Sequence, residues 1–331
     1  MTDIHDAVQA AQILPISGDE QDRPFWSVMI PTYNPRFAYL KESLESVLVQ
    51  DPGPERMQIE VVDDCSTEAN VAEMVQRIAG ERIKVSSTPQ NLGLAGCWNL
   101  CIEKSKGYWV HILHQDDAVL PGFYEKIENA ITTHENMALF ASRSFIIDNQ
   151  GIITMLTERV SNLEDGGYSV AGLYYSSPLQ CPAVVVKRKA YEALGGFRQD
   201  YKFTVDYEMW VRIISQMGGI VLTDILARYR MDSGNESSRL WRSTEALADL
   251  ERLHCFYAER YSDFNLRKAR RKMWRIATIH AKRMDKLNDI EGSSAIRRYL
   301  RKNLPVQIRL QGATEQMLRR LAKSLGLIFN L

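Results

Sequence analysis

Short apolar runs alternate with amphipathic helical patterns from Trp26 onward, and this alternation limits the fold more than any other feature of the chain. The runs at residues 27–30, 59–62, 83–86 and 108–113 are typical of strands, and residues 37–49, 69–79 and 94–105 have apolar side chains at helical spacing. Strands that alternate with helices indicate βαβ units. We therefore predict an α/β fold with a Rossmann-like, mainly parallel mixed sheet that is flanked by helices.

The pattern changes farther along the chain. A helix at 121–133 precedes a hairpin of strands at 138–147 and 152–156, a strand at 183–186, a helix at 205–217 and an extended run at 220–229. Long Arg-rich helical patterns begin after Leu240. We predict an N-terminal tail at 1–24, one α/β domain at 25–238 and a basic α-helical region at 239–331.

Cysteine usage and the distribution of apolar residues bear on the cellular compartment. The five cysteines are odd in number, and Cys97 and Cys101 stand four apart in a helical pattern, which favours packing roles. The first 24 residues are acidic and polar, unlike a signal peptide. No uncharged stretch reaches the ~18 residues of a membrane-spanning helix. We predict a cytoplasmic protein, with peripheral attachment to the inner face of the cell membrane as an open alternative.

Charge is divided unevenly along the chain, although the formal net charge is zero. Residues 241–331 contain 20 Lys and Arg against 9 Asp and Glu, so the rest of the chain carries the opposite excess. A basic half indicates a polyanionic or membrane-surface partner, and residues 267–275 place a Trp among basic residues as interfacial segments do. Homo-oligomer contacts through these helices, or packing against the acidic half, stay open as alternatives. We expect no nucleic-acid partner.

Polar clusters follow the first, second and fourth predicted strands directly. They are Thr32-Tyr33-Asn34, Asp63-Asp64 and Asp116-Asp117. Ligands of open α/β sheets lie beyond the carboxyl ends of the strands, so the three clusters can converge on one ligand. Each cluster alone also has a structural explanation, namely a turn before Pro35, capping of the helix at 69–79, and an Asx-type turn before the helix at 121–133.

Asp116 and Asp117 have the chemistry of a metal site. Adjacent residues in extended chain point to opposite sides, so one carboxylate can face an ion while its neighbour accepts from a ligand hydroxyl or the backbone. Mg²⁺ and Mn²⁺ accept carboxylate and phosphate oxygens together. We predict Mn²⁺ or Mg²⁺ as the cofactor.

Four ordered motifs together resemble glycosyltransferase family 2. They are Val28-Met29-Ile30-Pro31-Thr32-Tyr33-Asn34, Val61-Val62-Asp63-Asp64-Cys65-Ser66-Thr67, Asn91-Leu92-Gly93-Leu94-Ala95-Gly96 and Leu113-His114-Gln115-Asp116-Asp117. The resemblance covers about residues 25–235. It implies a GT-A fold with a nucleotide-binding half to about residue 118 and an acceptor-binding half after it.

The resemblance also implies which residues bind the nucleotide. They are Pro31, Thr32, Tyr33, Asn34, Asp63, Asp64, Asn91, Gly93 and Asp116. Thr32 and Tyr33 would flank a uracil or thymine base, and Asp64 would accept from the N3–H of that base. Gly93 would permit close approach of the backbone to the nucleotide.

The implied general base is Asp206, near the start of the helix at 205–217. The family usually has a Glu-Asp pair there, and Val205 replaces the Glu. The positive end of the helix dipole would keep Asp206 ionised, as a base requires. Ordinary pairing with that dipole is the alternative interpretation. Glu208 points elsewhere on a regular helix and cannot share the role.

The implied metal ligands are Asp117 and Asp116, and the residues around them depart from the family pattern. His114 stands where the family often has an acid, and Asp232 stands where a His often assists the metal or the diphosphate. Asp232 could bind a metal but could not neutralise phosphate, whereas Arg230 could bind phosphate.

The resemblance implies a glycosyltransferase. It would move a sugar from a UDP- or dTDP-sugar to a hydroxyl of a glycan, a lipid-linked or a small-molecule acceptor by metal-dependent inverting displacement. Two other classes stay open. A catalytically inactive sugar-nucleotide-binding protein would fit the replaced residues at 205 and 232. A nucleotidyltransferase would also use an acid pair, although residues 31–35 lack the Gly-rich phosphate loop usual in that class.

Overall fold

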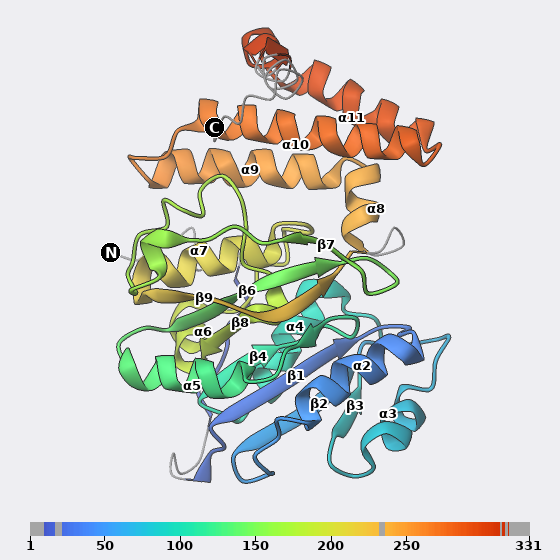
Figure 1. Ribbon diagram of the computed structural model, residues 1–331, viewed down its shortest axis with the longest axis vertical. Coiled ribbons are helices and arrows are strands. Elements are labelled where there is room, and N and C mark those ends of the chain that lie inside the picture. The colour runs from blue at the N-terminus through green and yellow to red at the C-terminus, as the bar shows by residue number, and fades with distance from the viewer. Residues whose placement is uncertain (1–9, 17–21, 232–235, 312, 315–316, 318–331) are drawn as a thin grey trace. The chain divides into compact units, whose positions relative to one another are not determined.

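The computed structural model describes residues 10–16, 22–231, 236–311, 313–314 and 317 of the chain. The chain divides into two compact units, which can be followed by colour in Figure 1. Unit 1 comprises residues 1–201 and 205–232, and unit 2 comprises residues 202–204 and 233–331.

Unit 1 contains a single mixed sheet with the strand order β3-β2-β1-β4-β8-β6-β9-β5, and β7 pairs with β6. The strands are β1 (Trp26–Thr32), β2 (Met57–Asp63), β3 (Lys84–Ser87), β4 (Trp109–Ile112), β5 (Ala118–Val119), β6 (Leu139–Ile147), β7 (Ile153–Leu156), β8 (Val184–Lys187) and β9 (Gly219–Arg230). Strands β1 to β4 pair in parallel, as do β6 and β9, whereas β8 runs antiparallel to β4 and β6. The predicted α/β class and mixed sheet are confirmed.

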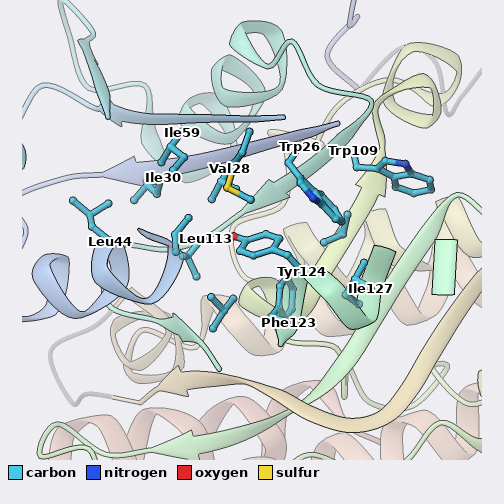
Figure 2. Packing of buried hydrophobic residues seen from close by; sticks show 14 of the residues in the cluster. Trp26, Val28, Ile30, Leu44, Ile59, Trp109, Leu113, Phe123, Tyr124 and Ile127 are labelled. Carbon is cyan, nitrogen blue, oxygen red and sulfur yellow. The ribbon is translucent and has the colours of Figure 1, made fainter. Parts of the chain in front are cut away.

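Helices cover both faces of this sheet. They are α2 (Phe37–Leu48), α3 (Val71–Ala79), α4 (Gly93–Lys104), α5 (Phe123–Thr133), α6 (Arg188–Leu194) and α7 (Val205–Met217). Alternate residues of β1, namely Trp26, Val28 and Ile30, pack in one apolar cluster with side chains of α2, α3 and α5. Figure 2 shows these three residues with Leu44 of α2 and Phe123 of α5. The members of that cluster include none from α4, α6 or α7, which contact β1, β8 and β6 respectively and so cover the opposite face.

The strand register brings the polar strand ends together. Thr32, the last residue of β1, pairs with Asp63, the last residue of β2, and Asp63 pairs with Ser87 of β3. Asp64 N–H donates to Thr32 O (2.7 Å). On the other side of β1, Leu113 N–H donates to Met29 O (3.0 Å). The loops that follow β1, β2 and β4 therefore begin at the same edge of the sheet.

Departures from the predicted elements have local reasons. Helix α5 begins at Phe123, two residues later than predicted, because Gly122 has a φ of +83° that lies outside the helix. Strand β5 and helix α6 were not predicted, since both are short. The predicted hairpin joins β6 and β7, and Gly151 takes the positive φ that its turn requires.

Residues 10–16 contact the segment between α6 and α7 within unit 1. Ala10 forms a β-bridge with Arg198, and Gly196 N–H donates to Ala11 O (2.7 Å). Ile13 is 2% exposed. This part of the predicted tail is thus bonded to the turn that precedes α7.

Unit 2 is helical. It contains α8 (Glu236–Arg242), α9 (Glu245–Arg260), α10 (Leu266–Lys286) and α11 (Ile290–Asn303), followed by a helical stretch that begins at Val306. Helix α10 packs against both α9 and α11 through its buried alanines, including Ala277 and Ala281. No helix among the described residues is both long enough and apolar enough to cross a membrane.

Candidate active site

Asp64 ties the loop after β2 to the start of α4. Its carboxylate accepts hydrogen bonds from the backbone N–H of Leu92 (2.7 Å) and Gly93 (3.0 Å) and from the Thr88 hydroxyl (3.2 Å). Among the described residues Oδ2 accepts only from Gly93, so one of its lone pairs remains for a ligand N–H. Asp64 is 3% exposed and anchors this loop, with one lone pair of Oδ2 unused among the described residues.

Asp63 holds its own loop and does not cap the following helix. Asn70 caps α3 by accepting from Glu73 N–H (3.1 Å). Asp63 accepts instead from the hydroxyl (2.5 Å) and the N–H (3.2 Å) of Ser66. The capping alternative, which placed Ser66 or Thr67 at the N-cap of this helix, is thus wrong, and Asp63 supports the loop that carries Asp64.

Gln115 joins the loop after β1 to the loop after β4. Tyr33 N–H donates to Gln115 Oε1 (2.8 Å), and Gln115 Nε2 donates to Tyr33 O (3.1 Å). This two-way pairing fixes the backbone of Tyr33 while the residue stays 46% exposed. An exposed ring on an anchored backbone can stack on a nucleobase. No local sequence pattern indicates this role of Gln115, although the residue stands within the fourth motif.

The other residues of the first motif make hydrogen bonds within β1 and between the loops after β1 and β2. Pro31 and Thr32 lie inside β1, and the Thr32 hydroxyl donates to Ile30 O (3.1 Å) in a buried position. The expectation that the Thr32 side chain flanks the base is therefore revised, because that side chain is turned toward its own strand. Asn34 Oδ1 accepts from the backbone N–H of Thr67 (2.8 Å), which joins the loops after β1 and β2.

Asn91 and Gly93 stand at the start of α4. Asn91 is exposed; its Nδ2 donates to Asp64 O (3.1 Å), and its Oδ1 accepts from Gly93 N–H (3.0 Å). Gly93 has a φ of +72°, and no atom lies within 4 Å of the position that a Cβ would take. The backbone conformation therefore requires glycine here, and the space beside it is open to a ligand.

Asp117 is the buried member of the acid pair after β4. It is 1% exposed, and its Oδ1 accepts from Arg230 N–H (2.8 Å). Its Oδ2 accepts no hydrogen bond from the described residues, although His114 Nδ1 lies 3.3 Å away. Burial and the charge of Asp117 raise the pKa of Asp116 to about 6. Two crowded carboxylates with an unsatisfied oxygen fit a divalent cation, since its positive charge would offset the repulsion between the carboxylates and give the unsatisfied oxygen a partner.

The protein supplies only part of a metal coordination shell. Among the described residues, no group of three or more His, Cys, Asp and Glu side chains is arranged to hold an ion by itself. Cations such as Mg²⁺ commonly bind through one or two carboxylates together with substrate phosphates, so Asp116 and Asp117 suffice for that mode. Asp232, the other acid predicted here, lies outside the described residues.

The buried side chain of Arg230 contacts the acid pair and two neighbouring acidic residues. Its Nε donates to Asp116 O (3.0 Å), its Nη1 donates to Asp148 O (3.1 Å), and its Nη2 pairs with the Glu42 carboxylate. The side chain is 3% exposed. Because all three guanidinium nitrogens have protein partners, we revise the predicted role of Arg230 from a phosphate ligand to a positioning residue for the acid pair.

His114 stands beside the acid pair. Its ring stacks on Trp98 of α4 with the centroids 4.9 Å apart. Burial acts to lower the pKa of His114, but interactions with Cys181 and Asp117 outweigh burial and raise this pKa well above its usual value. The chain thus places a basic group where the family often has an acid.

Asp206 lies in the first turn of α7, partly exposed. Burial raises the pKa of Asp206 to about 6, against the lowering effects of Tyr207 N–H, which donates to Oδ1 (2.7 Å), and of the charge on His114. The predicted effect of the helix dipole, which favours the ionised form, is therefore opposed by burial, which raises the pKa. The carboxylate is consequently a stronger base than an exposed Asp.

Glu208 has a separate structural role. It is 1% exposed and forms a bidentate ion pair with Arg212 (2.9 and 3.0 Å). Arg212 also donates to Gly196 O (2.9 Å), in the turn before α7. The expectation that Glu208 does not share the role of Asp206 agrees with this geometry.

A family model matches the part of the chain that contains most of these site residues. The model for glycosyl transferase family 2 matches residues 27–195, which is more than half of the chain. The chain belongs to glycosyl transferase family 2. The matched range includes the loops of Tyr33, Asp64 and Asp117, and Asp206 lies beyond it.

Relatives and solved structures agree with family 2 and with its fold. The Bacillus subtilis protein TuaG, whose name assigns it as a glycosyltransferase to teichuronic acid biosynthesis, is 24% identical over 245 residues, or 70% of this chain and 90% of TuaG. S. aureus TarS in complex with UDP-GlcNAc aligns with a TM-score of 0.58 and 16% identity, over 87% of this chain and 78% of that one. The mannosyltransferase PcManGT from Pyrobaculum calidifontis, in complex with GDP-Man and Mn²⁺, aligns with a TM-score of 0.54 and 15% identity, over 98% and 93% of the two chains. The predicted GT-A fold is confirmed.

Proposed function

We propose that this family 2 glycosyltransferase moves a sugar from a UDP- or dTDP-sugar to an acceptor hydroxyl, with inversion at the anomeric carbon. The observation that carries the proposal is the convergence of the loops after β1, β2 and β4 at one edge of the sheet, where Gln115 of the loop with the acid pair holds the backbone of Tyr33. The charge of His114, which lies 3.3 Å from Asp117, also lowers the pKa of Asp206, and this supports a place for the candidate base near the acid pair. A single displacement needs both groups around the same carbon atom.

The nucleotide would be recognised by Tyr33 and Asp64. Tyr33 offers an exposed ring on a fixed backbone, and Asp64 Oδ2 keeps one lone pair for the N3–H of uracil or thymine. Cytosine has an acceptor at N3, so a cytidine nucleotide would place two acceptors together and bind less well. This supports a UDP- or dTDP-sugar as the donor.

Asp116 and Asp117 would hold Mn²⁺ or Mg²⁺ together with the diphosphate of the donor. When bound, the ion supplies Lewis-acid stabilisation of the leaving nucleoside diphosphate. Arg230 positions the acid pair, because its backbone N–H donates to the Asp117 carboxylate and its Nε donates to the backbone carbonyl of Asp116.

Asp206 would act as the general base. It takes the proton of the acceptor hydroxyl while that oxygen bonds to the anomeric carbon and the bond from this carbon to the diphosphate oxygen breaks. With a pKa of about 6, the carboxylate is ionised at neutral pH and still more basic than an ordinary Asp. The relationship to TuaG supports a glycan as the acceptor class.

A panel of nucleotide-sugars, each assayed with and without Mn²⁺, tests this proposal. Thermal shift would identify the donor, and mass spectrometry with NMR of the anomeric proton would then follow transfer and its stereochemistry. We expect stabilisation by a UDP- or dTDP-sugar. Stabilisation by CDP-sugars alone would contradict the role of Asp64. Donor binding without transfer or donor hydrolysis would favour an inactive sugar-nucleotide-binding protein.

A further inference from the structure

Exposed apolar side chains are aligned on one side of the helical stretch that follows α11. Val306 and Leu310 are 58% and 63% exposed, and their interval of four residues places them on one helix face. Met317, farther along the chain, is 63% exposed. Ile308 lies on the opposite side, is 3% exposed and belongs to the core of unit 2. One side of this stretch thus anchors it in the unit, and the other side presents apolar surface to solvent.

Exposed basic side chains stand in α11, the helix that precedes this stretch in the chain. Arg298, Arg301 and Lys302 of α11 are exposed, and Arg309 within the stretch is partly exposed. None of these four forms an ion pair with an acidic side chain in the part of the chain that the structure describes. Glu291, in the first turn, is the one acid in the sequence of α11. The positive charge here is consequently uncompensated.

We propose that Val306, Leu310 and Met317, with Arg298, Arg301 and Lys302, form a docking surface for an anionic phospholipid bilayer. Amphipathic helices with basic residues lie in the plane of the membrane interface, with apolar side chains among the acyl chains and cations near the phosphates. We call these six residues the docking surface. The proposal goes beyond the transferase activity and does not depend on it.

Charge decides between a lipid surface and the other occupants. Two copies paired through the docking surface would bring like charges together, which costs free energy. A nucleic acid would compensate the cations but would leave Val306, Leu310 and Met317 in water. An anionic bilayer satisfies the apolar and the basic side chains at once.

Co-sedimentation of the full chain with vesicles tests the proposal without donor or acceptor. The vesicles contain phosphatidylcholine alone or phosphatidylcholine with phosphatidylglycerol. We expect binding to the anionic vesicles only, and we expect it to weaken as salt rises. The double substitution Leu310→Glu and Met317→Glu should abolish binding, because it places charge on the side that enters the acyl region. Val49→Glu, at a 76% exposed position in unit 1, is the matched control and should bind as the wild type does.

A second variant keeps the test independent of folding. Replacing Arg298, Arg301 and Lys302 with Gln should lower vesicle partitioning by about fivefold for each charge removed. Circular dichroism identifies any variant that unfolds. If the Leu310→Glu/Met317→Glu variant is unfolded, vesicle binding by the Gln variant tests the proposal instead. The proposal is overturned if the folded variants bind anionic vesicles as well as the wild type does. It is also overturned if the wild type does not bind them. A concentration-dependent dimer that Leu310→Glu and Met317→Glu abolish overturns it as well, because the occupant would then be a second copy.

Discussion

The backbone N–H of Arg230 donates a hydrogen bond of 2.8 Å to Asp117 Oδ1 and so joins the end of β9 to the acid pair after β4. The two residues are 113 positions apart in the sequence. Oδ2 of the same carboxylate accepts no hydrogen bond from the described residues. Asp117 thus combines a structural contact through one oxygen with a second oxygen that lies 3.3 Å from His114 and is the candidate metal ligand.

Two substitutions of Asp117 should separate these functions. Asp117→Asn keeps an oxygen that can accept from Arg230 N–H but removes the charge, so we expect near wild-type unfolding and a loss of Mn²⁺-dependent nucleotide binding. Asp117→Ala also leaves the buried N–H without a partner, which should lower the free energy of unfolding by about 1–3 kcal/mol. Calorimetry with UDP and Mn²⁺, beside urea unfolding, measures both. Unchanged nucleotide affinity in both variants would remove Asp117 from the metal site.

Asp206→Asn should abolish most of the transfer but spare donor binding. Loss of a general base lowers the rate by about 10²–10⁴-fold, and Asn cannot accept the proton of the acceptor hydroxyl. The measurement is kcat for transfer beside the Kd of the donor. Asp224→Asn, which removes an exposed acid paired with Lys126, is the control. Equal kcat for Asp206→Asn and the wild type would refute the role of Asp206.

The pH dependence of transfer should reflect the ionisation of Asp206. Burial raises the pKa of this carboxylate to about 6, and only the ionised form can accept a proton. The rate should therefore be constant above about pH 7 and fall by about tenfold per unit below about pH 6. An acid limb near pH 4, the usual range of an exposed Asp, would contradict the buried environment of Asp206.

Gln115 should act as a positioning residue for Tyr33. Gln115→Ala removes both hydrogen bonds to the Tyr33 backbone, and we expect the KM for the donor to rise by about tenfold while kcat changes little. Gln115→Glu keeps the acceptor for Tyr33 N–H but loses the donor to Tyr33 O, so its KM for the donor sugar nucleotide should lie between those of the wild type and Gln115→Ala. A purely structural role would instead lower the melting temperature of both variants without changing the KM of the folded protein.

His111 should make the fold sensitive to acid. The ring is buried between Tyr124 Oη and Pro182 O, each 3.0 Å away, and burial lowers the pKa of His111 to about 4. The unfolded chain takes up this proton near pH 6.5 and the folded chain does not, so stability falls as the pH drops from about 6.5 toward 4. At pH 5 the loss should be about 2 kcal/mol for this residue.

Urea unfolding at about pH 7.5 and about pH 5 measures this effect. His111→Gln cannot titrate, so we expect lower stability at neutral pH but a smaller decrease on acidification than in the wild type. The same pH dependence in both proteins would assign the acid sensitivity to other groups.

The sequence was sufficient for those parts of the protein that depend on local pattern. Apolar runs and helical spacing predicted β1 to β4 with the helices between them, because the periodicity of a strand or a helix depends only on residues that are close together in the sequence. The positions of Tyr33, Asp64 and Asp117 at strand ends followed from the same pattern. Short elements such as β5 and α6 carry too few residues for a periodic signal.

The sequence by itself determined the family, the order of the loops and the residue types that they present. Only the tertiary structure decided which groups remain available for chemistry. Arg230 is engaged by Glu42 and Asp148, Gln115 holds Tyr33 across 82 positions, and burial sets the pKa of Asp206. Hydrogen-bond partners and desolvation depend on residues that are distant in the chain and meet only after the sheet has formed, so no local pattern encodes them.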